Sequence, residues 1–359
     1  MWAGAANAVK IAAIFSQTGI AAEGNAQAIE AVQMAVEDIN AAGGLLGAPL
    51  ELLLLDNQST PLGSLAAARD AVAAGVAAVI GPSRSSQAIA VAKVLQQAKI
   101  PMITPDATDP QITRIGDFIF RACLPDEFQG QRLAQFARRD LKAKTAVVLV
   151  NNTEAYSIGL ATVFKATFIQ EGGRLLWEGN YKGNAIDFSE QLATVHKLRP
   201  DLLFIPGYSR DSGLIAKQGA GMGIKACFLG GDGWDGGDII DYGGKALEGS
   251  FYMTHWHPDV AFPSSGPFIR AFQDKIGART AIMASGPLAY DAVNLLANAI
   301  IRAGSSESDR IREALSATRH FEGVSGRIRF DANGDPLEKP ACIIQIRKAQ
   351  LHLYRTISP

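Results

Sequence analysis

The stretch VIGPSRSSQAIAVAKVLQQAKIPMITPDATDP, residues 79–110, decides the fold because it alternates between strand-like and helix-like segments. Its opening apolar run stops at Gly81-Pro82, a pair that terminates strands. Residues 88–97 are rich in Ala, Val and Leu and predict a helix, and residues 100–104 predict a second strand that ends at a proline. Two successive parallel strands would therefore deliver their carboxyl-end turns to the same edge of one sheet.

Both turns carry short polar side chains that suit a small anion. They are Ser83, Ser85 and Ser86 in the first turn and Asp106, Thr108 and Asp109 in the second. Helix N-termini at such turns expose unpaired N–H groups and the positive end of the helix dipole, so a carboxylate fits there. The same residue types are the usual N-caps of helices, so two capped helices without any ligand are the alternative.

The rest of the chain continues this alternation in two runs, which predicts parallel sheets with helices on both faces. A length of 359 residues exceeds one typical core and predicts two domains. Strands are expected at residues 9–15, 50–55, 77–80 and 118–120, then at 145–150, 175–180, 201–205, 226–229, 250–254, 327–330, 341–347 and 351–355. Helices are expected at residues 25–40 and 62–74, in a short segment after Pro110, and at 127–140, 155–170, 188–198, 212–220, 267–275, 287–303 and 309–317.

The composition of the chain argues against several classes of protein. A net charge of −1 provides no basic surface for nucleic acid. No apolar run approaches the roughly 18 residues of a membrane span. The first ten residues lack the basic and apolar regions of a signal peptide, so we expect that a signal peptide was removed or never present. Cys123, Cys227 and Cys342 are odd in number and far apart, so they predict neither a metal site nor a disulfide framework.

Several motifs suggest known sites but lack an essential part. His255 and His257 flank Trp256, but no third metal ligand is evident, so we expect them at a hinge with Trp256 packed between the domains. The sequence has no GxxxxGK, no GxGxxG after the first strand and no nucleophile elbow with His and Asp partners. We therefore expect a protein that is not an enzyme and holds no metal or cofactor. Trp234 is expected in a wall or in the core, with stacking on a planar ligand as the alternative.

Seven motifs together carry a resemblance that spans almost the whole chain. In order, they are VKIAAIFSQTG, AVEDINAAGGLLGAPLELLLLDNQSTP, VIGPSRSSQA, PMITPDATDP, FIFRACLPD, FIPGYSRDSG and LGGDGW. In the order and approximate spacing of these motifs, the chain resembles the leucine/isoleucine/valine-binding family of periplasmic solute receptors, which serve ABC importers. The resemblance implies the type I periplasmic binding fold, with two doubly wound, Rossmann-like α/β lobes joined by three crossover strands.

The resemblance also implies how the chain divides. Lobe 1 would comprise residues 1–121 and 255–328, and lobe 2 would comprise residues 126–249 and 331–359. The crossovers would lie near residues 121–126, 249–255 and 326–332. In the family, an amino acid sits in the cleft between the lobes, which close on it.

On lobe 1, the family's roles transfer onto the two turns quoted first. Ser85, next to Ser86, stands where the family places a hydroxyl on the ligand α-carboxylate. Ala107 and Thr108, next to Asp106, stand where the backbone and a threonine hydroxyl bind the carboxylate and the ammonium group.

On lobe 2, Asp232 within GGDGW stands where an acidic residue takes the ammonium group. Tyr156 and Tyr208 stand where aromatic rings cover the ligand. Such an arrangement meets both charges of a zwitterion, whose burial would otherwise be prohibitive. Because the two charges are met from different lobes, full satisfaction of the ligand requires closure.

Three departures from the family pattern put an aliphatic ligand side chain in doubt. Asp106 stands where a small residue is common, so it either caps a helix or selects a ligand with an additional cation or donor. Ser59 and Arg84 stand where some members carry a disulfide, so Arg84 can instead pair with Asp56 or reach a ligand acid. Residues 21–25 lack the tyrosine that the family often offers there.

We therefore expect an extracytoplasmic, monomeric solute-binding protein, periplasmic or lipid-anchored. It would bind a branched-chain or related small amino acid, deliver it to the membrane permease of an ABC importer, and have no nucleic-acid partner. The alternatives are a ligand-sensing regulator of the same fold and a receptor for an aromatic acid or amide.

Overall fold

The computed structural model divides the chain into two compact units, and each is described here by itself. It describes residues 8–260, 262–278 and 280–358. Unit 1 comprises Met1–Leu124 and Val260–Lys339, and unit 2 comprises Pro125–Asp259 and Pro340–Pro359. The chain therefore passes between the units three times.

Only the first passage, at residues 124–125, lies within a range where the sequence placed a crossover. The second passage follows residue 259 rather than 249–255, and His255 still contacts Asp232 of unit 2 at 3.3 Å. The third follows Lys339 rather than 326–332, since the Lys339 ammonium group still donates to the Ser325 hydroxyl of unit 1 at 2.6 Å.

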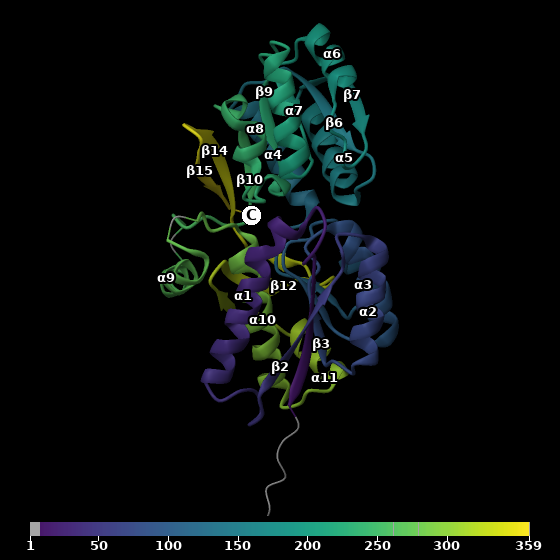
Figure 1. Cartoon of the computed structure of the whole chain (residues 1–359), viewed down its shortest axis with the longest axis vertical. Coiled ribbons are helices and arrows are strands. Elements are labelled where there is room, and N and C mark those ends of the chain that lie inside the picture. Colours follow the sequence, from purple (N-terminus) through teal and green to yellow (C-terminus); the bar gives the residue numbers. More distant parts are fainter. Residues whose placement is uncertain (1–7, 261, 279, 359) are drawn as a thin grey trace, which may run out of the picture. The chain divides into compact units, whose positions relative to one another are not determined.

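Unit 1 contains a parallel five-stranded sheet in the order β2-β1-β3-β4-β5. Its strands are β1 (Val9–Phe15), β2 (Leu50–Asp56), β3 (Ala78–Ile80), β4 (Met102–Thr104) and β5 (Ile119–Arg121). Its helices are α1 (Ala22–Ala41), α2 (Pro61–Ala73), α3 (Ser85–Ala98), η1 (Thr113–Ile115), α9 (Ser265–Ile276), α10 (Ser285–Ala303) and α11 (Ser308–Ser316). Figure 1 shows α2 and α3 on one side of the strands and α1 with α10 on the other.

Burial explains the apolar runs of the inner strands β1, β3 and β4. Residues 11–15 of β1 are fully buried, because helices cover both faces of a parallel sheet. Helix α3 buries Val91 and Leu95 against the same core. Strands β3 and β4 pair directly, with Ile80 opposite Ile103. The turns that follow these two strands therefore lie at one edge of the sheet, as the sequence predicted.

A small antiparallel sheet, β11 (Phe321–Gly323), β12 (Gly326–Phe330) and β13 (Pro336–Leu337), completes unit 1. The hairpin turn expected after residue 330 forms between β12 and β13. There the Asp331 carboxylate accepts hydrogen bonds from the backbone N–H groups of Asn333 and Asp335, at 2.8 and 2.9 Å. Strands β11 and β13 were not predicted, because two or three residues are too few to show a period.

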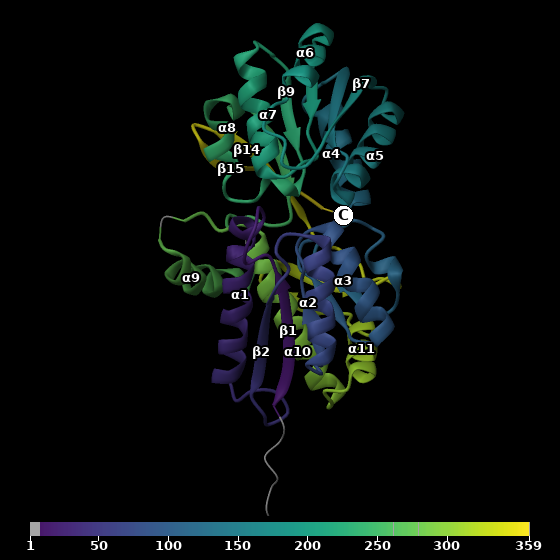
Figure 2. The same cartoon turned by 45° about the vertical axis from the view of Figure 1, so that its right-hand side comes forward.

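Unit 2 contains a seven-stranded sheet in the order β15-β14-β10-β9-β8-β6-β7. Its strands are β6 (Thr145–Asn151), β7 (Arg174–Tyr181), β8 (Leu202–Phe204), β9 (Cys227–Gly230), β10 (Phe251–Thr254), β14 (Ala341–Arg347) and β15 (Gln350–Ile357). The helices are α4 (Asp126–Arg139), α5 (Ala155–Gln170), α6 (Ser189–Leu198), α7 (Ser209–Gly221), η2 (Asp232–Trp234), α8 (Ile239–Gly243) and η3 (Gly244–Leu247). Strands β6 to β10 pair in parallel, whereas β14 and β15 add an antiparallel edge. In unit 2, α4 packs against α5, and α7 packs against α6 and α8 (Figure 2).

Most predicted elements are present, with ends displaced by a few residues. The short helix expected after Pro110 is a single turn, Thr113–Ile115, and α8 was not predicted. Within the described ranges, no helix has both the length and the apolar character that a membrane crossing requires.

Candidate functional site

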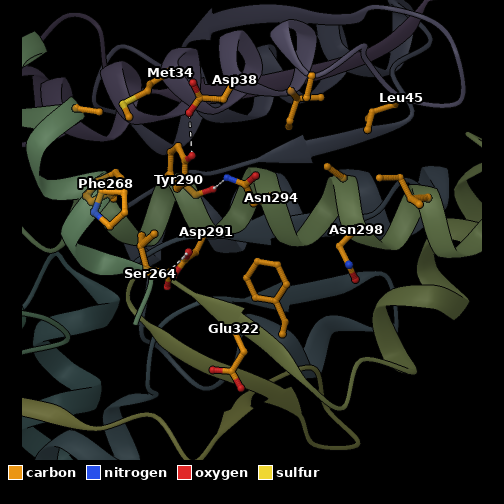
Figure 3. A pocket seen from close by; sticks show the side chains of 18 of the residues that line it. Met34, Asp38, Leu45, Ser264, Phe268, Tyr290, Asp291, Asn294, Asn298 and Glu322 are labelled. Carbon is orange, nitrogen blue, oxygen red and sulfur yellow. Dashed lines mark hydrogen bonds between the residues drawn. The ribbon is translucent and has the colours of Figure 1, made fainter. Parts of the chain in front are cut away.

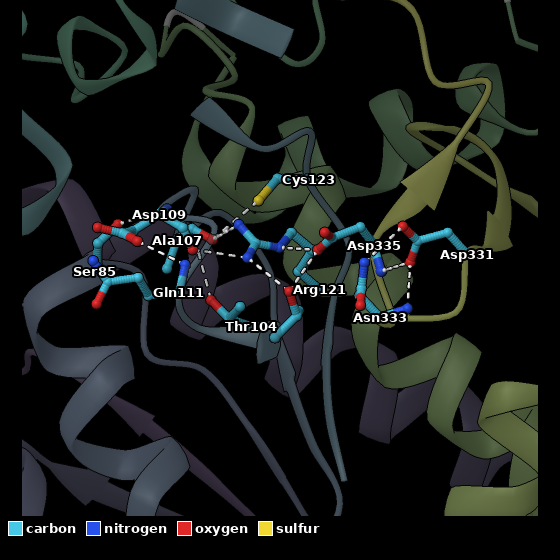
Figure 4. Close-up of polar contacts among 11 residues, drawn as sticks. Ser85, Thr104, Ala107, Asp109, Gln111, Arg121, Cys123, Asp331, Asn333 and Asp335 are labelled. Carbon is cyan, nitrogen blue, oxygen red and sulfur yellow. Dashed lines mark hydrogen bonds and ion pairs between the residues drawn. The ribbon is translucent and has the colours of Figure 1, made fainter. Parts of the chain in front are cut away.

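A fully buried arginine organises the part of unit 1 that carries the predicted carboxylate-binding residues (Figure 4). Arg121 is the last residue of β5, and its guanidinium group donates to the backbone oxygens of Ala107 and Asp109, at 3.1 and 2.8 Å. It also donates to the Thr113 hydroxyl at 3.2 Å, and its Nε lies 2.6 Å from the Asp335 carboxylate. Arg121 therefore fixes the backbone of residues 107–109, and the sequence analysis gave it no role.

The turn after β4 is also tied to the turn after β3. The Thr104 hydroxyl donates to the Pro82 backbone oxygen at 2.5 Å and accepts from the Ala107 N–H at 3.2 Å. The Cys123 thiol donates to the Ala107 oxygen at 3.4 Å. Ala107 thus has its backbone N–H and C=O engaged within unit 1.

Ser85 joins the two predicted turns instead of capping its own helix. It is the first residue of α3, and its Oγ accepts a hydrogen bond from the backbone N–H of Asp109 at 3.2 Å. The N-cap position of α3 belongs to Arg84, which makes no side-chain cap bond. The Ser85 hydroxyl keeps its own hydrogen to donate.

Among the predicted lobe 1 residues, Thr108 gives the clearest indication of a ligand site. Its side chain is buried, and its hydroxyl has no hydrogen-bond partner within the part of the chain that the structure describes. Ser86 and Asp106 are half-buried beside these residues. Burial raises the pKa of neighbouring Asp109, while the Gln111 N–H and the charge of Arg121 oppose that change. Ser85 and Thr108 thus lie on turns that meet, as the sequence predicted.

In unit 2, Asp232 is held by two side chains that the sequence analysis did not select. Gln129 Nε2 donates to Asp232 Oδ1 at 2.7 Å, and the Asp232 N–H donates back to Gln129 Oε1 at 3.1 Å. On the other oxygen, Asp232 Oδ2 lies 3.3 Å from His255 Nε2. Both carboxylate oxygens therefore have a protein partner, and each still has a lone pair for a further donor.

The glycines on either side of Asp232 allow this close packing. A Cβ on Gly231 would lie 2.5 Å from the Tyr156 hydroxyl, and one on Gly233 would lie 2.7 Å from the Gly207 backbone oxygen. The Tyr156 hydroxyl accepts from the Gly233 N–H at 2.9 Å. The backbone on both sides of Asp232 is therefore fixed against α5 and the turn after β8.

Tyr156 and Tyr208, both predicted to cover a ligand, stack on each other with ring centroids 5.3 Å apart. Burial raises the pKa of Tyr156 well above its ordinary value, and the charges of Asp232 and Asp126 act in the same direction. Tyr156 is therefore a neutral phenol whose hydroxyl supports the Asp232 loop. Tyr208 is half-buried at the N-cap of α7.

Trp234 is a core residue, which corrects its inclusion among the ligand-binding candidates. Its side chain is fully buried, and its indole N–H donates to the Ile205 backbone oxygen at 3.0 Å. A Cβ on Gly230 would lie 2.2 Å from the indole ring, so Trp234 packs directly on β9. It has neither an exposed face nor a spare donor for a planar ligand.

The structure gives partners to further residues that the sequence analysis named. The Asp56 carboxylate, proposed as a partner of Arg84, accepts hydrogen bonds from the backbone of Gln17 at 2.9 Å and from the Thr18 hydroxyl at 2.6 Å. His257 Nδ1 accepts from the Asp259 N–H at 3.2 Å, whereas His255 contacts Asp232. Among the described residues, no group of three His, Cys, Asp or Glu side chains could hold a metal ion.

Unit 1 has a second buried ionic cluster, beside the third passage of the chain. The Asp291 carboxylate accepts from the backbone N–H groups of Val324 and Ser325, at 2.7 and 2.8 Å, and from the Ser325 hydroxyl. Lys339 donates to that hydroxyl from a fully buried position. Burial lowers the pKa of Lys339 to about 8, while the charge of Asp291 opposes this change. This cluster anchors the end of unit 1.

Unit 1 also has a hollow with a volume of about 760 Å³, and none of the predicted site residues lines it. Figure 3 shows the side chains around this hollow. It is lined by residues of α1, α9, α10 and β11. At its wall the Tyr290 hydroxyl donates to Asp38 at 2.8 Å, and Glu322 pairs with Arg327 at 2.6 Å. Because these polar groups already have partners, the hollow does not compete with the two turns as a ligand site.

Comparison with known proteins now identifies the family. The sequence model described as "Periplasmic binding protein" matches residues 8–350. The chain belongs to the periplasmic binding protein family. The leucine-, isoleucine-, valine-, threonine- and alanine-binding protein of Pseudomonas aeruginosa is 33% identical to it over 334 residues, which cover 92% of this chain and 88% of that relative.

Two solved structures match nearly the whole chain. A leucine-binding protein of Thermotoga maritima is 34% identical, with a TM-score of 0.93 and coverage of 98% of this chain and 99% of that one. The branched-chain amino acid transporter substrate-binding protein of Streptococcus pneumoniae, solved with isoleucine, is 27% identical, with a TM-score of 0.91 and coverage of 98% and 100%. The predicted family and the predicted fold class are thereby confirmed.

Proposed function

We propose that this periplasmic binding protein is the solute-binding component of an ABC importer and that its ligand is a branched-chain or related small amino acid. The observation that carries the proposal is the setting of Asp232. Its two carboxylate oxygens are oriented by Gln129 and His255, yet no lysine or arginine is among these partners. An oriented, uncompensated carboxylate suits a ligand ammonium group.

The turns of unit 1 would bind the other charged group of the ligand, its carboxylate. The Ser85 hydroxyl, at the start of α3, and the Thr108 hydroxyl are donors placed where helix dipole and hydroxyls favour a carboxylate. Tyr208 is proposed to cover the ligand from unit 2. We further propose that the bound state requires contacts from both units, so that the ligand itself favours closure.

The proposal extends to partner and compartment. A binding protein of this kind delivers its ligand to a membrane permease and works outside the cytoplasm as a monomer. The amino-acid-binding relatives named above support that role. The protein needs no catalytic residue or cofactor for it.

A thermal-shift screen of the twenty amino acids, aromatic acids and short amides tests the proposal. A ligand that binds only the folded state raises the melting temperature by mass action. Branched-chain amino acids are expected to produce the shift. If only compounds without an ammonium group do so, the proposed ligand class is wrong.

Asp232→Asn gives the matching residue test. The substitution keeps an oxygen for the Gln129 amide but removes the charge, and charge-assisted hydrogen bonds contribute roughly 1.5–3 kcal/mol each. We expect leucine affinity in calorimetry to fall by about 10- to 100-fold. Asp187→Asn, at an exposed carboxylate of unit 2 that accepts from the Ser189 N–H, is the control and should bind normally. Equal affinities of the two variants would contradict the role of Asp232.

A further inference from the structure

His255 is placed to share Asp232 with a ligand. The residue follows β10, its side chain is 2% exposed, and its Nε2 lies 3.3 Å from Asp232 Oδ2. An ionised carboxylate only accepts hydrogen bonds, so the Nε2 atom that faces Asp232 must carry a hydrogen. The ring is therefore a donor to the same carboxylate that is proposed to hold the ligand ammonium group.

The surroundings of the second ring nitrogen, Nδ1, select neither the neutral nor the protonated form of His255. His255 Nδ1 is buried and has no hydrogen-bond partner among residues 8–260, 262–278 and 280–358. No hydrogen-bond acceptor therefore keeps Nδ1 protonated, and no hydrogen-bond donor keeps it deprotonated. The ring can be neutral or cationic without losing its contact with Asp232.

The charge of the ring changes what Asp232 offers to a ligand. With a neutral imidazole, the Asp232–His255 pair has a net charge of about −1 and attracts a cation. With an imidazolium ion, the pair has no net charge, and an ammonium group gains much less from it. Gln129 also orients the carboxylate, but its amide side chain is always neutral and therefore differs from the His255 ring.

We propose that His255 is a specificity-determining residue that competes with the ligand ammonium group for Asp232. When the ring is neutral, the site selects zwitterionic amino acids. When the ring is protonated, the site accepts carboxylates that lack an ammonium group almost as well. The inference rests on the proposed function and adds a proton-controlled choice of ligand to it.

The other titratable groups around this loop of unit 2 do not supply a competing cation. Asp126 of α4 and Tyr208 interact electrostatically with Tyr156 of α5, whose hydroxyl supports the loop. Asp235 follows η2 and accepts from the Tyr252 hydroxyl of β10 at 3.3 Å and from the Thr254 hydroxyl at 2.7 Å. Cys342 of β14 faces the same carboxylate, and burial raises its pKa to about 12, so it stays a neutral thiol. Of the groups named, only His255 can become positive.

The test compares leucine with 4-methylpentanoate, which has the same carbon skeleton without the amino group. Affinities of the full chain for both are measured by calorimetry at about pH 8 and about pH 5.5, on either side of the range in which imidazole ordinarily changes charge. The ratio of leucine affinity to 4-methylpentanoate affinity is expected to fall at least about tenfold at the lower pH, which corresponds to about 1.4 kcal/mol.

His255→Gln is the decisive variant, because a glutamine amide can donate to Asp232 but cannot titrate. Its affinity ratio should be the same at both pH values. His257→Gln is the matched control, since His257 contacts Asp259 rather than Asp232, and it should keep the pH dependence of the unmodified protein. Circular dichroism checks that both variants fold.

A direct measurement covers the case in which His255→Gln does not fold. Nitrogen-15 NMR of the histidine rings follows the titration of His255 with and without leucine. The midpoint of that titration should move to lower pH when leucine binds, because the ammonium group and the ring proton compete. An unmoved midpoint would overturn the inference.

The outcomes also separate this inference from the proposed function. If leucine binds and the affinity ratio does not change with pH, or changes equally in His255→Gln, His255 does not determine specificity while the proposed function stands. If no amino acid binds at either pH, the proposed function itself is wrong and the inference fails with it.

Discussion

Replacing Arg121 with methionine should destabilise unit 1 and disorder the turn that carries Ala107 and Thr108. Methionine keeps much of the apolar stem but removes every donor of the guanidinium group. The backbone oxygens of Ala107 and Asp109 would lose that donor, and the Asp335 carboxylate would lose its ion-pair partner.

The structure gives the magnitude of this loss. Removing one partner of a buried ion pair costs roughly 3–5 kcal/mol, because the other charge is left buried. The Asp335 side chain is 14% exposed and still accepts from the Thr113 hydroxyl at 2.9 Å, which lowers this cost. The two backbone oxygens add about 1 kcal/mol each, which roughly offsets this reduction. We therefore expect a loss of about 3–5 kcal/mol in total, or about 6–20 °C in the melting temperature of a unit of this size.

The distribution of tryptophans makes the effect measurable in the intact protein. Trp177, Trp234 and Trp256 all belong to unit 2, and Trp2 lies outside the described residues. Urea unfolding followed by circular dichroism reports both units, whereas tryptophan fluorescence reports mainly unit 2. Arg121→Met should shift the circular dichroism transition more than the fluorescence transition.

Arg327→Met provides the control within unit 1. Arg327 pairs with Glu322 on the surface, with side chains 51% and 58% exposed, and such pairs contribute little. Its unfolding should be nearly unchanged. If Arg121→Met costs no more than Arg327→Met and leaves leucine affinity intact, the argument that a buried guanidinium organises the ligand turn is wrong.

Two further predictions concern buried groups elsewhere. Folding lowers the pKa of Lys339 from 10.5 to about 8, so the unfolded chain binds more protons between these values and the contribution of this lysine to stability rises with pH across that window. The difference in unfolding free energy between the unmodified protein and Lys339→Met should therefore increase by up to about 3 kcal/mol from pH 8 to pH 10.5, and urea unfolding that shows a constant difference would contradict this. Gly233→Ala would place a Cβ 2.7 Å from the Gly207 oxygen and 2.8 Å from the Tyr156 ring, so we expect at least a tenfold loss of leucine affinity in calorimetry. Gly221→Ala, whose Cβ meets no atom within 4 Å, should bind normally, and equal binding by both variants would refute the steric argument.

Local sequence signals predicted the alternating elements well. The apolar strands and the amphipathic helices carry their periods within a few consecutive residues, so the parallel sheets could be inferred before the structure was known. The same signals placed Ser85 and Thr108 on neighbouring turns, and β3 and β4 do pair directly. Asp232 was proposed from its motif alone, and its role as a ligand-binding residue stays a prediction.

The supporting residues could not be found in this way, because their contacts join distant parts of the chain. Gln129 and Asp232 are 103 positions apart, and His255 and Asp232 are 23 apart. Arg121 meets Asp335 across more than two hundred residues. A single buried arginine at the end of a strand was the one available signal, since an arginine in an apolar run requires a partner.

The crossovers predicted near residues 249–255 and 326–332 differ from the unit boundaries at residues 259–260 and 339–340 for a related reason. The sequence shows where a strand ends but not which sheet it joins. Strand β12 pairs within unit 1 through β11 and β13, and only after Lys339 does the chain enter unit 2. The sequence left the position of Trp234 open between the core and the ligand for the same reason. Its burial depends on contacts with Gly230 and Ile205, which local sequence does not show.

A buried, positively charged side chain lies at or shortly before two of the three passages between the units. Arg121 precedes Leu124 by three residues, and Lys339 is itself the last residue of unit 1. Arg121 is held by the Asp335 carboxylate and two backbone oxygens, and Lys339 by the Ser325 hydroxyl and the charge of Asp291, so the torsion angles next to each have little freedom. At these two passages, the first backbone torsion angles free of the anchors are therefore those beginning at Pro125 and at Pro340. Glycine substitutions at these two prolines should add backbone freedom there, whereas substitutions further inside unit 1 would act by destabilising the anchors.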